Sequence, residues 1–260
     1  MSSSTPPAEA QTLQQVTAAD DYFARVSEVV NEIESTTDQW RAVELLEEAT
    51  RRMGAQVAIF ASFIRDDASG KSYRLLVACD PQWCIEYGQQ SWYADDPWLN
   101  YAIEHTSPIR GSEIPVSTQA QQSIVELTQR FGFASSVIVP TPSSRGRSRR
   151  GVLCLGSSVP GYFEAEGYLK FRVVARSVAM ELHEWWLKRL QEEFIDASGI
   201  TAAEVRLLRL EREGLSTKEI AERLSMTHMT VNSRFQRIRA KLGVTTRKAA
   251  ARLAAEYGLL

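Results

Sequence analysis

The sequence lacks the features of a membrane or secreted protein. No stretch of its 260 residues approaches the roughly 20 consecutive apolar residues that a membrane-spanning helix needs. The N-terminus, MSSSTPPAEAQTLQQ, has neither the basic start nor the apolar segment of a secretory signal. We therefore expect no membrane partner, and we predict that residues 1–17 form a disordered tail.

Cysteine and histidine are also scarce. The three cysteines, Cys79, Cys84 and Cys154, are odd in number and have no paired metal-ligand spacing, and the three histidines are scattered. An odd set of cysteines without a secretory signal indicates free thiols in a reducing compartment. The sequence thus predicts a cytoplasmic protein without a disulfide framework or a metal site.

An enzyme motif is not apparent. Glu86, Asp95 and Asp96 lie close together and would fit the acid–base pair of an enzyme. No nucleophile motif, Gly-rich phosphate loop or metal-binding constellation accompanies these carboxylates. We predict no catalytic residue and no cofactor, and an enzyme with an appended module is the minor alternative.

The charge, in contrast, is distributed unevenly. The whole chain has a net charge of −2, but residues 200–260 hold twelve Lys or Arg and six Glu, a net charge of +6. Residues 1–199 therefore carry a net charge of −8. A small basic module attached to a larger acidic one is typical of a module that binds a polyanion such as DNA.

Three helix starts stand out in the basic module. Thr201 precedes Glu204 by three residues, and Ser216 precedes Glu219 in the same way. Each pair is a capping box, in which the hydroxyl and the carboxylate accept hydrogen bonds from backbone N–H groups at the start of a helix. Thr227 can cap a third helix, which follows a tight turn. Two short helices joined by such a turn form a helix-turn-helix.

The third helix of this module has one apolar face and one polar face. Its apolar residues recur at the spacing of a buried helix face, and the opposite face carries side chains that can reach base edges in a DNA major groove. These candidate base contacts are Asn232, Ser233, Gln236 and Arg237. The candidate phosphate contacts are Lys218, Thr230, Arg234, Arg239, Lys241 and Arg247.

Residues 200–260 resemble the LuxR-type DNA-binding domain. The resemblance is carried by Thr201 and Glu204, Leu207-Leu208, Glu213–Ser216, Glu219–Ala221, Leu224, Thr230-Val231, Lys241–Val244, Arg247 and Ala249. It implies a four-helix module whose third helix reads bases, chiefly through Asn232 and Gln236. It also implies a double-stranded DNA operator as partner.

The larger acidic part is predicted to be a separate domain. Residues 18–35, 39–53, 81–90, 97–104, 118–131 and 163–194 have helical patterns, and residues 56–65, 73–79, 135–140 and 152–157 have strand patterns. This order predicts an α/β sensor domain over residues 18–195, with a small antiparallel sheet between helix layers. A short linker, residues 196–199, would join it to the all-α helix-turn-helix domain.

The stretch WCIEYGQQSWYADDPW, residues 83–98, combines five aromatic residues with three carboxylates. Its spacing, Trp83, Tyr87, Trp92 and Asp96-Pro97, resembles the autoinducer-binding domain of LuxR-type quorum-sensing regulators. That domain binds N-acyl-homoserine lactones. The resemblance implies that Trp83 donates to the lactone carbonyl, Asp96 accepts from the acyl amide, Tyr87 packs beside the amide and Trp92 lines the acyl wall.

The resemblance continues downstream, with three departures in the expected pocket. Matching residues are Pro108-Ile109, Phe131–Phe133, Pro140 and Gly151–Leu153. Cys79 stands where the family often has Tyr, Arg110-Gly111 where a ring-packing Trp usually follows, and Cys154 where a Ser or Thr often binds the ligand. A different small molecule, or no ligand, is therefore the alternative to a lactone. If no ligand binds, Trp83, Tyr87 and Trp92 are ordinary core residues.

The long helix near residue 180 is predicted to serve dimerisation. Apolar residues follow helical spacing along it, and its C-terminal end carries Leu182, Trp185 and Trp186. Tryptophan is enriched at protein interfaces, and DNA readers of this class usually bind two half-sites as two-fold dimers. We therefore predict a homodimer on a two-fold symmetric operator.

Overall fold

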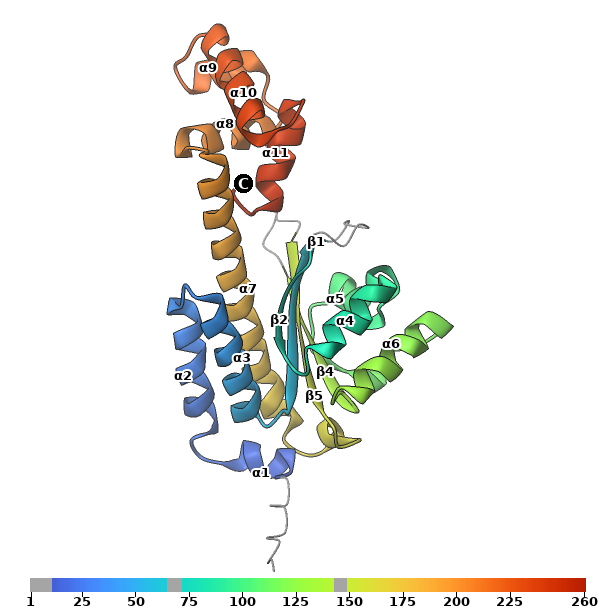
Figure 1. The fold of residues 1–260 in the computed structure, drawn as a ribbon. Coiled ribbons are helices and arrows are strands. Elements are labelled where there is room, and N and C mark those ends of the chain that lie inside the picture. The colour runs from blue at the N-terminus through green and yellow to red at the C-terminus, as the bar shows by residue number, and fades with distance from the viewer. Residues whose placement is uncertain (1–10, 65–71, 143–148) are drawn as a thin grey trace, which may run out of the picture.

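The computed structural model describes residues 11–64, 72–142 and 149–260. Its N-terminal part is built on an antiparallel sheet with the strand order β2-β1-β5-β4-β3 (Figure 1). The strands are β1 (Val57–Ile64), β2 (Arg74–Ala78), β3 (Ile109–Arg110), β4 (Ser135–Thr141) and β5 (Arg149–Ser157). The sheet and the helices around it confirm the predicted fold class.

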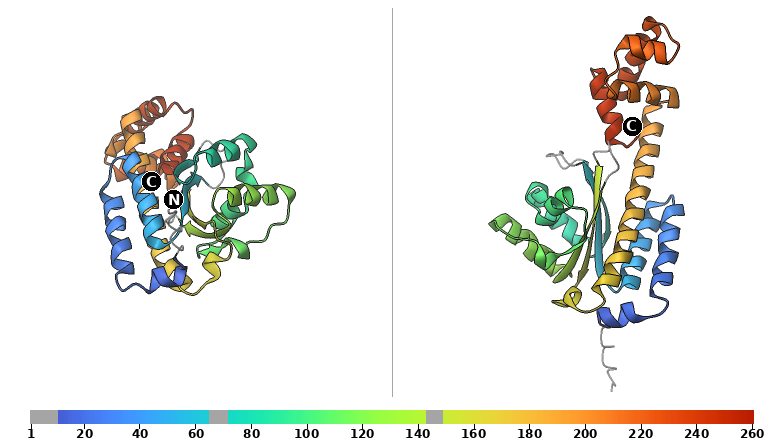
Figure 2. Two further views of the ribbon diagram at one scale, coloured as in Figure 1. Left: turned by 60° about the horizontal axis from the view of Figure 1, so that its bottom comes forward. Right: turned by 180° about the vertical axis from the view of Figure 1, so that it is seen from behind.

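Helices cover both faces of this sheet (Figures 1 and 2). One face is covered by α1 (Leu13–Ala18), α2 (Tyr22–Ser35), α3 (Gln39–Met53) and the first part of α7 (Tyr168–Ser198). The other is covered by α4 (Gln82–Gln90), α5 (Pro97–Glu104) and α6 (Gln119–Arg130). Short 3-10 turns occur at η1 (Trp92–Ala94), η2 (Gly111–Glu113) and η3 (Tyr162–Glu164).

The sequence of β1, VAIFASFI, explains why both faces are covered. Successive side chains of a strand point to opposite faces, and nearly every position of β1 is apolar and buried. Ala58 and Phe60 pack against the α2, α3 and α7 side, whereas Ile59, Ala61 and Phe63 pack against the α4–α6 side. The protein therefore has two cores, one on each side of the sheet.

The C-terminal part contains α8 (Ala202–Arg212), α9 (Thr217–Arg223), α10 (His228–Leu242) and α11 (Arg247–Glu256). The two predicted capping boxes form: Thr201 pairs with Glu204, and Ser216 with Glu219. Thr227 caps α10 by accepting from the backbone N–H of Thr230 at 3.1 Å. The helix-turn-helix predicted from these caps is thus formed by α9 and α10.

The predicted disordered tail is wrong for its last residues, because residues 13–17 belong to helix α1. Thr12 and Gln15 form a capping box at its start, a pattern that the sequence reading overlooked. Leu13 and Thr17 are buried against the α7 side of the protein. Residues 1–10 lie outside the described part of the chain.

The predicted linker is also wrong, because α7 continues through residue 198 and ends at Gly199, whose φ is +60°. Figure 1 shows α7 running past the end of the sheet to the C-terminal helices. There, the rings of Phe194 and Tyr257 stack with centroids 4.4 Å apart, and Gln191 donates to the carbonyl of Gly258 at 2.8 Å. A continuous helix with side contacts fixes the C-terminal domain more firmly than a flexible linker would.

The dimerisation residues predicted on α7 lie inside the protein's own core. Leu182, Trp185 and Trp186 are 0%, 5% and 2% exposed, and the Trp185 indole donates to the carbonyl of Thr36 at 2.7 Å. Helices α2 and α3 pack on this stripe and bury it. Helical spacing correctly indicated burial, but the covering surface is the same chain and not a second one.

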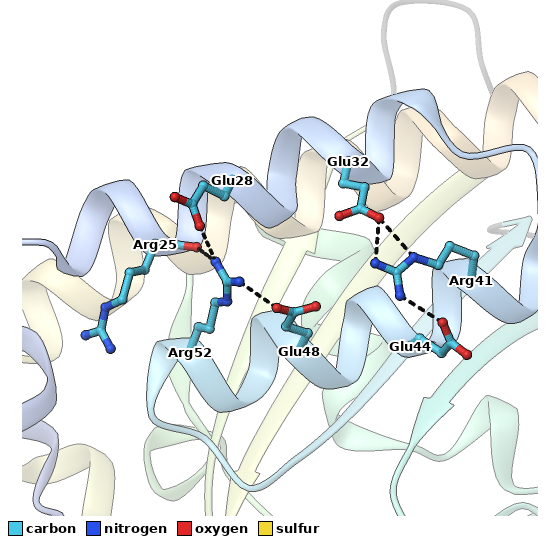
Figure 3. A network of polar contacts seen from close by, with 7 residues as sticks. All are labelled: Arg25, Glu28, Glu32, Arg41, Glu44, Glu48 and Arg52. Atoms are coloured by element: carbon cyan, nitrogen blue, oxygen red, sulfur yellow. Dashed lines mark hydrogen bonds and ion pairs between the residues drawn. The ribbon is translucent and has the colours of Figure 1, made fainter.

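Ion pairs join α2 to α3 on the outer surface of this layer (Figure 3). Arg52 bridges Glu28 and Glu48, and Arg41 bridges Glu32 and Glu44. Exposed pairs of this kind contribute little stability each, and these pairs link α2 to α3. Among the described residues, no helix is both long and apolar enough to cross a membrane.

Candidate functional site

The residues predicted to bind a ligand meet on the α4–α6 side of the sheet. Trp83 and Tyr87 lie one turn apart on α4, and their rings stack with centroids 4.7 Å apart. Asp96 lies at the start of α5, and its carboxylate accepts a hydrogen bond from the Tyr87 hydroxyl at 2.7 Å. Trp83, Tyr87 and Asp96 are 6%, 4% and 6% exposed, so they form one buried group.

Asp96 has two roles at this position. One carboxylate oxygen accepts from the backbone N–H groups of Trp98 and Leu99, at 2.8 and 3.2 Å, and so caps α5. Pro97 follows at the first helical position, where its fixed φ suits a helix start. The other oxygen faces Tyr87 and remains able to accept a further hydrogen bond, because a carboxylate oxygen has two lone pairs.

Burial has the largest effect on the pKa values of Asp96 and Tyr87. It raises the pKa of Asp96 above its usual value, although the hydrogen bonds from Tyr87, Leu99 and Trp98 favour the ionised form. Burial, followed by the charge on Asp96, also holds the pKa of Tyr87 well above 10.0, so the phenol stays a donor. A buried carboxylate with few donors is stabilised by any further donor that enters the site.

The indole nitrogen of Trp83 is buried and has no hydrogen-bond partner among the described residues. Leaving such a donor unpaired costs about 1–3 kcal/mol. Trp83 stacks on the same Tyr87 ring that donates to Asp96. An unpaired donor and a buried acceptor therefore belong to two residues that both contact Tyr87, which suits a molecule that carries both a carbonyl and an N–H or O–H group.

Further aromatic rings surround this polar group. Tyr87 contacts the rings of Trp92 and Tyr93 edge-on, at 6.2 and 5.4 Å between centroids. Tyr73, directly before β2, has its ring centroid 4.5 Å from that of Tyr93 and stacks on Phe63 of β1 at 5.1 Å. The sequence placed Trp92 here correctly, but it did not assign Tyr73 or Phe63, because residues far from α4 along the chain share no local spacing with it.

Cys154 lies on the floor of the group, on β5 between Ile59 of β1 and Ile138 of β4. Its side chain is 7% exposed. Burial, followed by the charge on Asp96, raises its pKa well above 9.0, so it stays a neutral thiol near that carboxylate. The thiol is a weak donor, and it occupies the place that the sequence assigned to it.

The Arg110-Gly111 step is a structural anchor. A Cβ on Gly111 would lie 2.0 Å from the Ser136 hydroxyl, so no side chain fits there without movement. Arg110 donates to the carbonyl of Phe163 at 2.8 Å, and its guanidinium lies 3.9 Å over the Tyr168 ring. This segment contributes no aromatic wall to the site.

Cys79 is another departure from the family pattern. Its pKa is raised to about 12, mainly by burial.

The polar face predicted on α10 is open to solvent. Asn232, Gln236 and Arg237 are exposed, and Ser233 is half-buried, while Val231, Phe235 and Ile238 form the buried face. Met229 lies on the same exposed face, three residues before Asn232, and is 81% exposed. The sequence reading missed Met229, although a large apolar residue so close to a predicted base-reading pair was a usable signal.

The predicted phosphate contacts divide into two groups. Lys218 and Arg234 have no ion-pair partner among the described residues, and Thr230 shares a hydrogen bond with Thr227 at 2.9 Å. The other three make hydrogen bonds within the domain, and their role as phosphate contacts stays a prediction. Arg239 donates to the carbonyl of Thr245, Lys241 to Glu204 and the carbonyl of Gly199, and Arg247 to Thr217 and Asn232.

Comparison with known families matches both parts of this architecture. Residues 38–183 match the family described as the autoinducer binding domain, and residues 198–254 match the bacterial regulatory proteins of the luxR family. The chain belongs to the LuxR family. It is therefore a transcription regulator with an autoinducer-binding domain and a DNA-binding helix-turn-helix, as predicted, and this is not a family of enzymes.

Solved structures of LuxR-family regulators share the fold. A structure of SdiA in complex with octanoyl-rac-glycerol has a TM-score of 0.70 at 16% identity, covering 93% of this chain and 97% of that one. Escherichia coli SdiA in another crystal form gives 0.71 at 15% identity, covering 92% and 99%. The N-acylhomoserine-lactone-dependent factor CepR2 from Burkholderia cenocepacia gives 0.55 at 13% identity, covering 65% and 98%. No curated protein matches the chain in sequence.

Proposed function

We propose that this LuxR-family regulator binds an N-acyl-homoserine lactone between α4, α5 and the sheet, and that the lactone changes its affinity for DNA. The observation that carries the proposal is that Trp83, whose buried indole N–H has no partner among the described residues, stacks on Tyr87, which donates to the buried carboxylate of Asp96. A lactone carbonyl accepts from the first group, and an acyl amide N–H donates to the second. The polar groups of the pocket thus match the two functional groups of this ligand.

The remaining residues accommodate the ligand's apolar parts and its orientation. Tyr87 contacts both the indole and the carboxylate and so lies beside the amide, while Trp92 lines the acyl chain. Cys154 closes the floor near Asp96. Ligand pockets are mostly apolar with a few placed polar groups, and this composition fits an acylated signal molecule.

A different acylated ligand is the alternative, and Gly111 favours it. Glycine provides no side chain at this position, so the lactone ring would lack one aromatic wall. The similar fold of SdiA is described with octanoyl-rac-glycerol bound. An acylglycerol has a carbonyl for Trp83 and hydroxyl donors for Asp96, but no amide N–H.

Thermal unfolding of the full-length protein tests both ligands. We expect at least one member of a panel of N-acyl-homoserine lactones with varied chains to raise the unfolding midpoint. Ligand at about a hundred times its dissociation constant adds roughly 2.7 kcal/mol to the stability of the folded state. A rise with octanoyl-rac-glycerol alone would favour the alternative ligand, and no rise with either class would contradict a pocket for acylated signals.

We further propose that α10 enters the major groove, with Gln236 reading a base and Lys218 binding a phosphate. Gln236→Ala is expected to relax the preference among operator sequences by about tenfold, because a good side-chain–base contact contributes about 1–3 kcal/mol of discrimination. Lys218→Ala should instead weaken binding to all duplexes alike and reduce the salt dependence. Fluorescence anisotropy with duplexes selected from a random library measures both, and unchanged affinities in both variants would contradict this orientation.

Binding to a two-fold operator requires a homodimer, and α7 offers a surface for it away from the buried tryptophans. Leu169 and Val173 lie one turn apart on α7 and are 73% and 53% exposed. We propose that this exposed stripe takes part in the dimer contact. Sedimentation equilibrium should show a dimer for the wild type and a shift to monomer for Val173→Glu, and identical behaviour would place the contact elsewhere.

The cellular compartment follows from the same proposal. Operator DNA and free thiols both belong to a reducing interior, and the cysteines of the described residues are unpaired. We therefore propose that the regulator acts in the cytoplasm. When cells are quenched with acid and their proteins are then denatured, the cysteines should be alkylated without prior reduction, because denaturation removes the burial that raises the pKa values of Cys79 and Cys84. A requirement for reduction would contradict this location.

A further inference from the structure

Arg247, at the start of α11, is held at the junction of the three helices that form the DNA-reading part of the protein. One guanidinium nitrogen donates to the hydroxyl of Thr217 on α9 at 3.0 Å. The other donates to the side-chain oxygen of Asn232 on α10. The guanidinium carbon lies 4.3 Å over the centroid of the buried Phe235 ring. Three contacts from two helices therefore fix this side chain in one place.

This fixed cation determines which end of the Asn232 amide faces inward. A guanidinium has N–H donors and no acceptor, so the amide atom that faces it has to be the oxygen and not the nitrogen. Asn232 is exposed on the proposed base-reading face of α10. Its Nδ2 donor group is consequently the end of the amide that remains free to approach DNA.

The four bases differ in what such a donor finds in the major groove. Guanine presents two acceptors there, O6 and N7, and thymine presents O4. Adenine is usually recognised by an Asn or Gln amide that accepts from N6 and donates to N7 at once. This contact with adenine needs both ends of the amide to face the base, and here the oxygen faces Arg247. The amide is therefore better suited to a base that it contacts through Nδ2 alone.

We propose that Arg247 is a positioning residue for sequence specificity, which orients the Asn232 amide so that it donates to guanine or thymine in preference to adenine. The proposal rests on the DNA-binding function proposed above. In this proposal Arg247 acts by orienting Asn232, whereas Arg234 on the same surface would bind a phosphate. The preference would be lost when the guanidinium is removed, even if the domain stays folded.

The test uses the full-length protein, with and without N-octanoyl-homoserine lactone, and a random duplex library. Selection with the wild type and with Asn232→Ala first identifies the base pair that Asn232 reads. Four duplexes that differ only at this pair are then titrated with each variant. The wild type should prefer guanine or thymine over adenine by about tenfold. For Arg247→Met, whose side chain can still cover Phe235, this ratio should fall to about threefold or less.

Two further variants separate positioning from a merely structural role. Arg247→Lys keeps a donor-only cation beside Asn232 and should largely restore the preference. In an Asn232→Ala background, Arg247→Met should change the ratio no further, because two residues that act through one contact are not additive. Arg252→Met on the same helix, where Arg252 pairs with Glu256, is the matched control and should keep the wild-type ratio.

The outcomes distinguish this proposal from the function on which it rests. An unchanged ratio in Arg247→Met, with Asn232→Ala still relaxing the preference, would overturn the role of Arg247 alone. A preference for adenine in the wild type would overturn the proposed donor orientation. A wild type that binds the library without any sequence preference would instead contradict the DNA-reading function of α10. Thermal unfolding of each variant shows whether the domain has remained folded.

Discussion

Trp83→Phe should abolish most of the ligand-induced rise in unfolding midpoint while leaving the unliganded protein about as stable as the wild type. The substitution removes an indole N–H that has no partner without ligand, which relieves a penalty of about 1–3 kcal/mol. The loss of ring volume in a packed cluster costs a similar amount. With ligand bound, the lost hydrogen bond leaves a buried carbonyl unpaired, so affinity should fall about tenfold or more.

Trp186→Phe provides a matched control for this experiment. The Trp186 indole nitrogen is also buried and has no hydrogen-bond partner in the described part of the chain, but it lies in the core on the opposite side of the sheet. This variant should have a similarly small effect on the unliganded protein and retain the full response to ligand. Equal responses in wild type and Trp83→Phe would contradict the proposed hydrogen bond to the ligand carbonyl.

Asp96→Ala should lower the free energy of unfolding by about 2–4 kcal/mol, whereas Asp96→Asn should change it by less than about 1.5 kcal/mol. Alanine removes the helix cap, worth about 0.5–2 kcal/mol, and leaves the buried Tyr87 hydroxyl unpaired, which costs about 1–3 kcal/mol. Asparagine retains an oxygen for the backbone N–H groups of Trp98 and Leu99. Both variants should lose the response to a ligand that donates an amide N–H.

The pH dependence of Asp96→Asn provides a second measure of the same carboxylate. Because the pKa of Asp96 is raised in the folded state, its ionised form disfavours folding. This unfavourable contribution is absent below the ordinary pKa of 3.8, appears as pH rises, and is complete above the raised pKa. Urea denaturation should therefore show wild type losing stability relative to Asp96→Asn as pH rises, and the opposite trend would contradict the burial argument.

The C-terminal domain was largely predictable from sequence because its signals are local. A capping box places a hydroxyl and a carboxylate three residues apart, and Thr201–Glu204 and Ser216–Glu219 both mark true helix starts. The buried face of α10 follows the helical period. The contacts of Arg239, Lys241 and Arg247 were missed because each joins positions on different helices or loops, which no local pattern records.

The sensor domain shows a different limit. Strands β1, β2, β4 and β5 and most helices were expected, whereas β3, α1 and the covering of the α7 stripe were not. Helical spacing reveals that Leu182 and Trp185 are buried, and it contains no information on whether a partner chain or α2 and α3 cover them. The continuation of α7 through residues 196–198 was also missed, since short polar stretches suit helices and linkers alike.

The candidate pocket lies between these two cases. The resemblance placed Trp83, Tyr87, Trp92 and Asp96 together, and the structure brings them together. Two physical details were not accessible from sequence: the unpaired indole N–H, and the close approach of Ser136 to Gly111. The unpaired indole N–H supports the proposal of an acylated ligand. The head group of that ligand is the property that the panel of lactones and octanoyl-rac-glycerol determines.

Helix α7 connects the sensor domain to the DNA-binding domain. It packs on the face of the sheet opposite to the candidate ligand site and continues to Ser198. At its far end, Phe194 stacks on Tyr257 of the C-terminal domain. A ligand that favours one packing of the sensor would therefore favour one orientation of α10, and so shift the population of molecules able to bind an operator.

The measurement that tests this account most directly is the affinity of the full-length protein for a selected operator duplex, with and without a panel of N-acyl-homoserine lactones. The account predicts that at least one lactone changes the affinity by about tenfold or more, equivalent to about 1.4 kcal/mol, and that Trp83→Phe suppresses this change. An operator affinity that no lactone and no octanoyl-rac-glycerol alters would contradict the claim that this protein is a signal-dependent regulator.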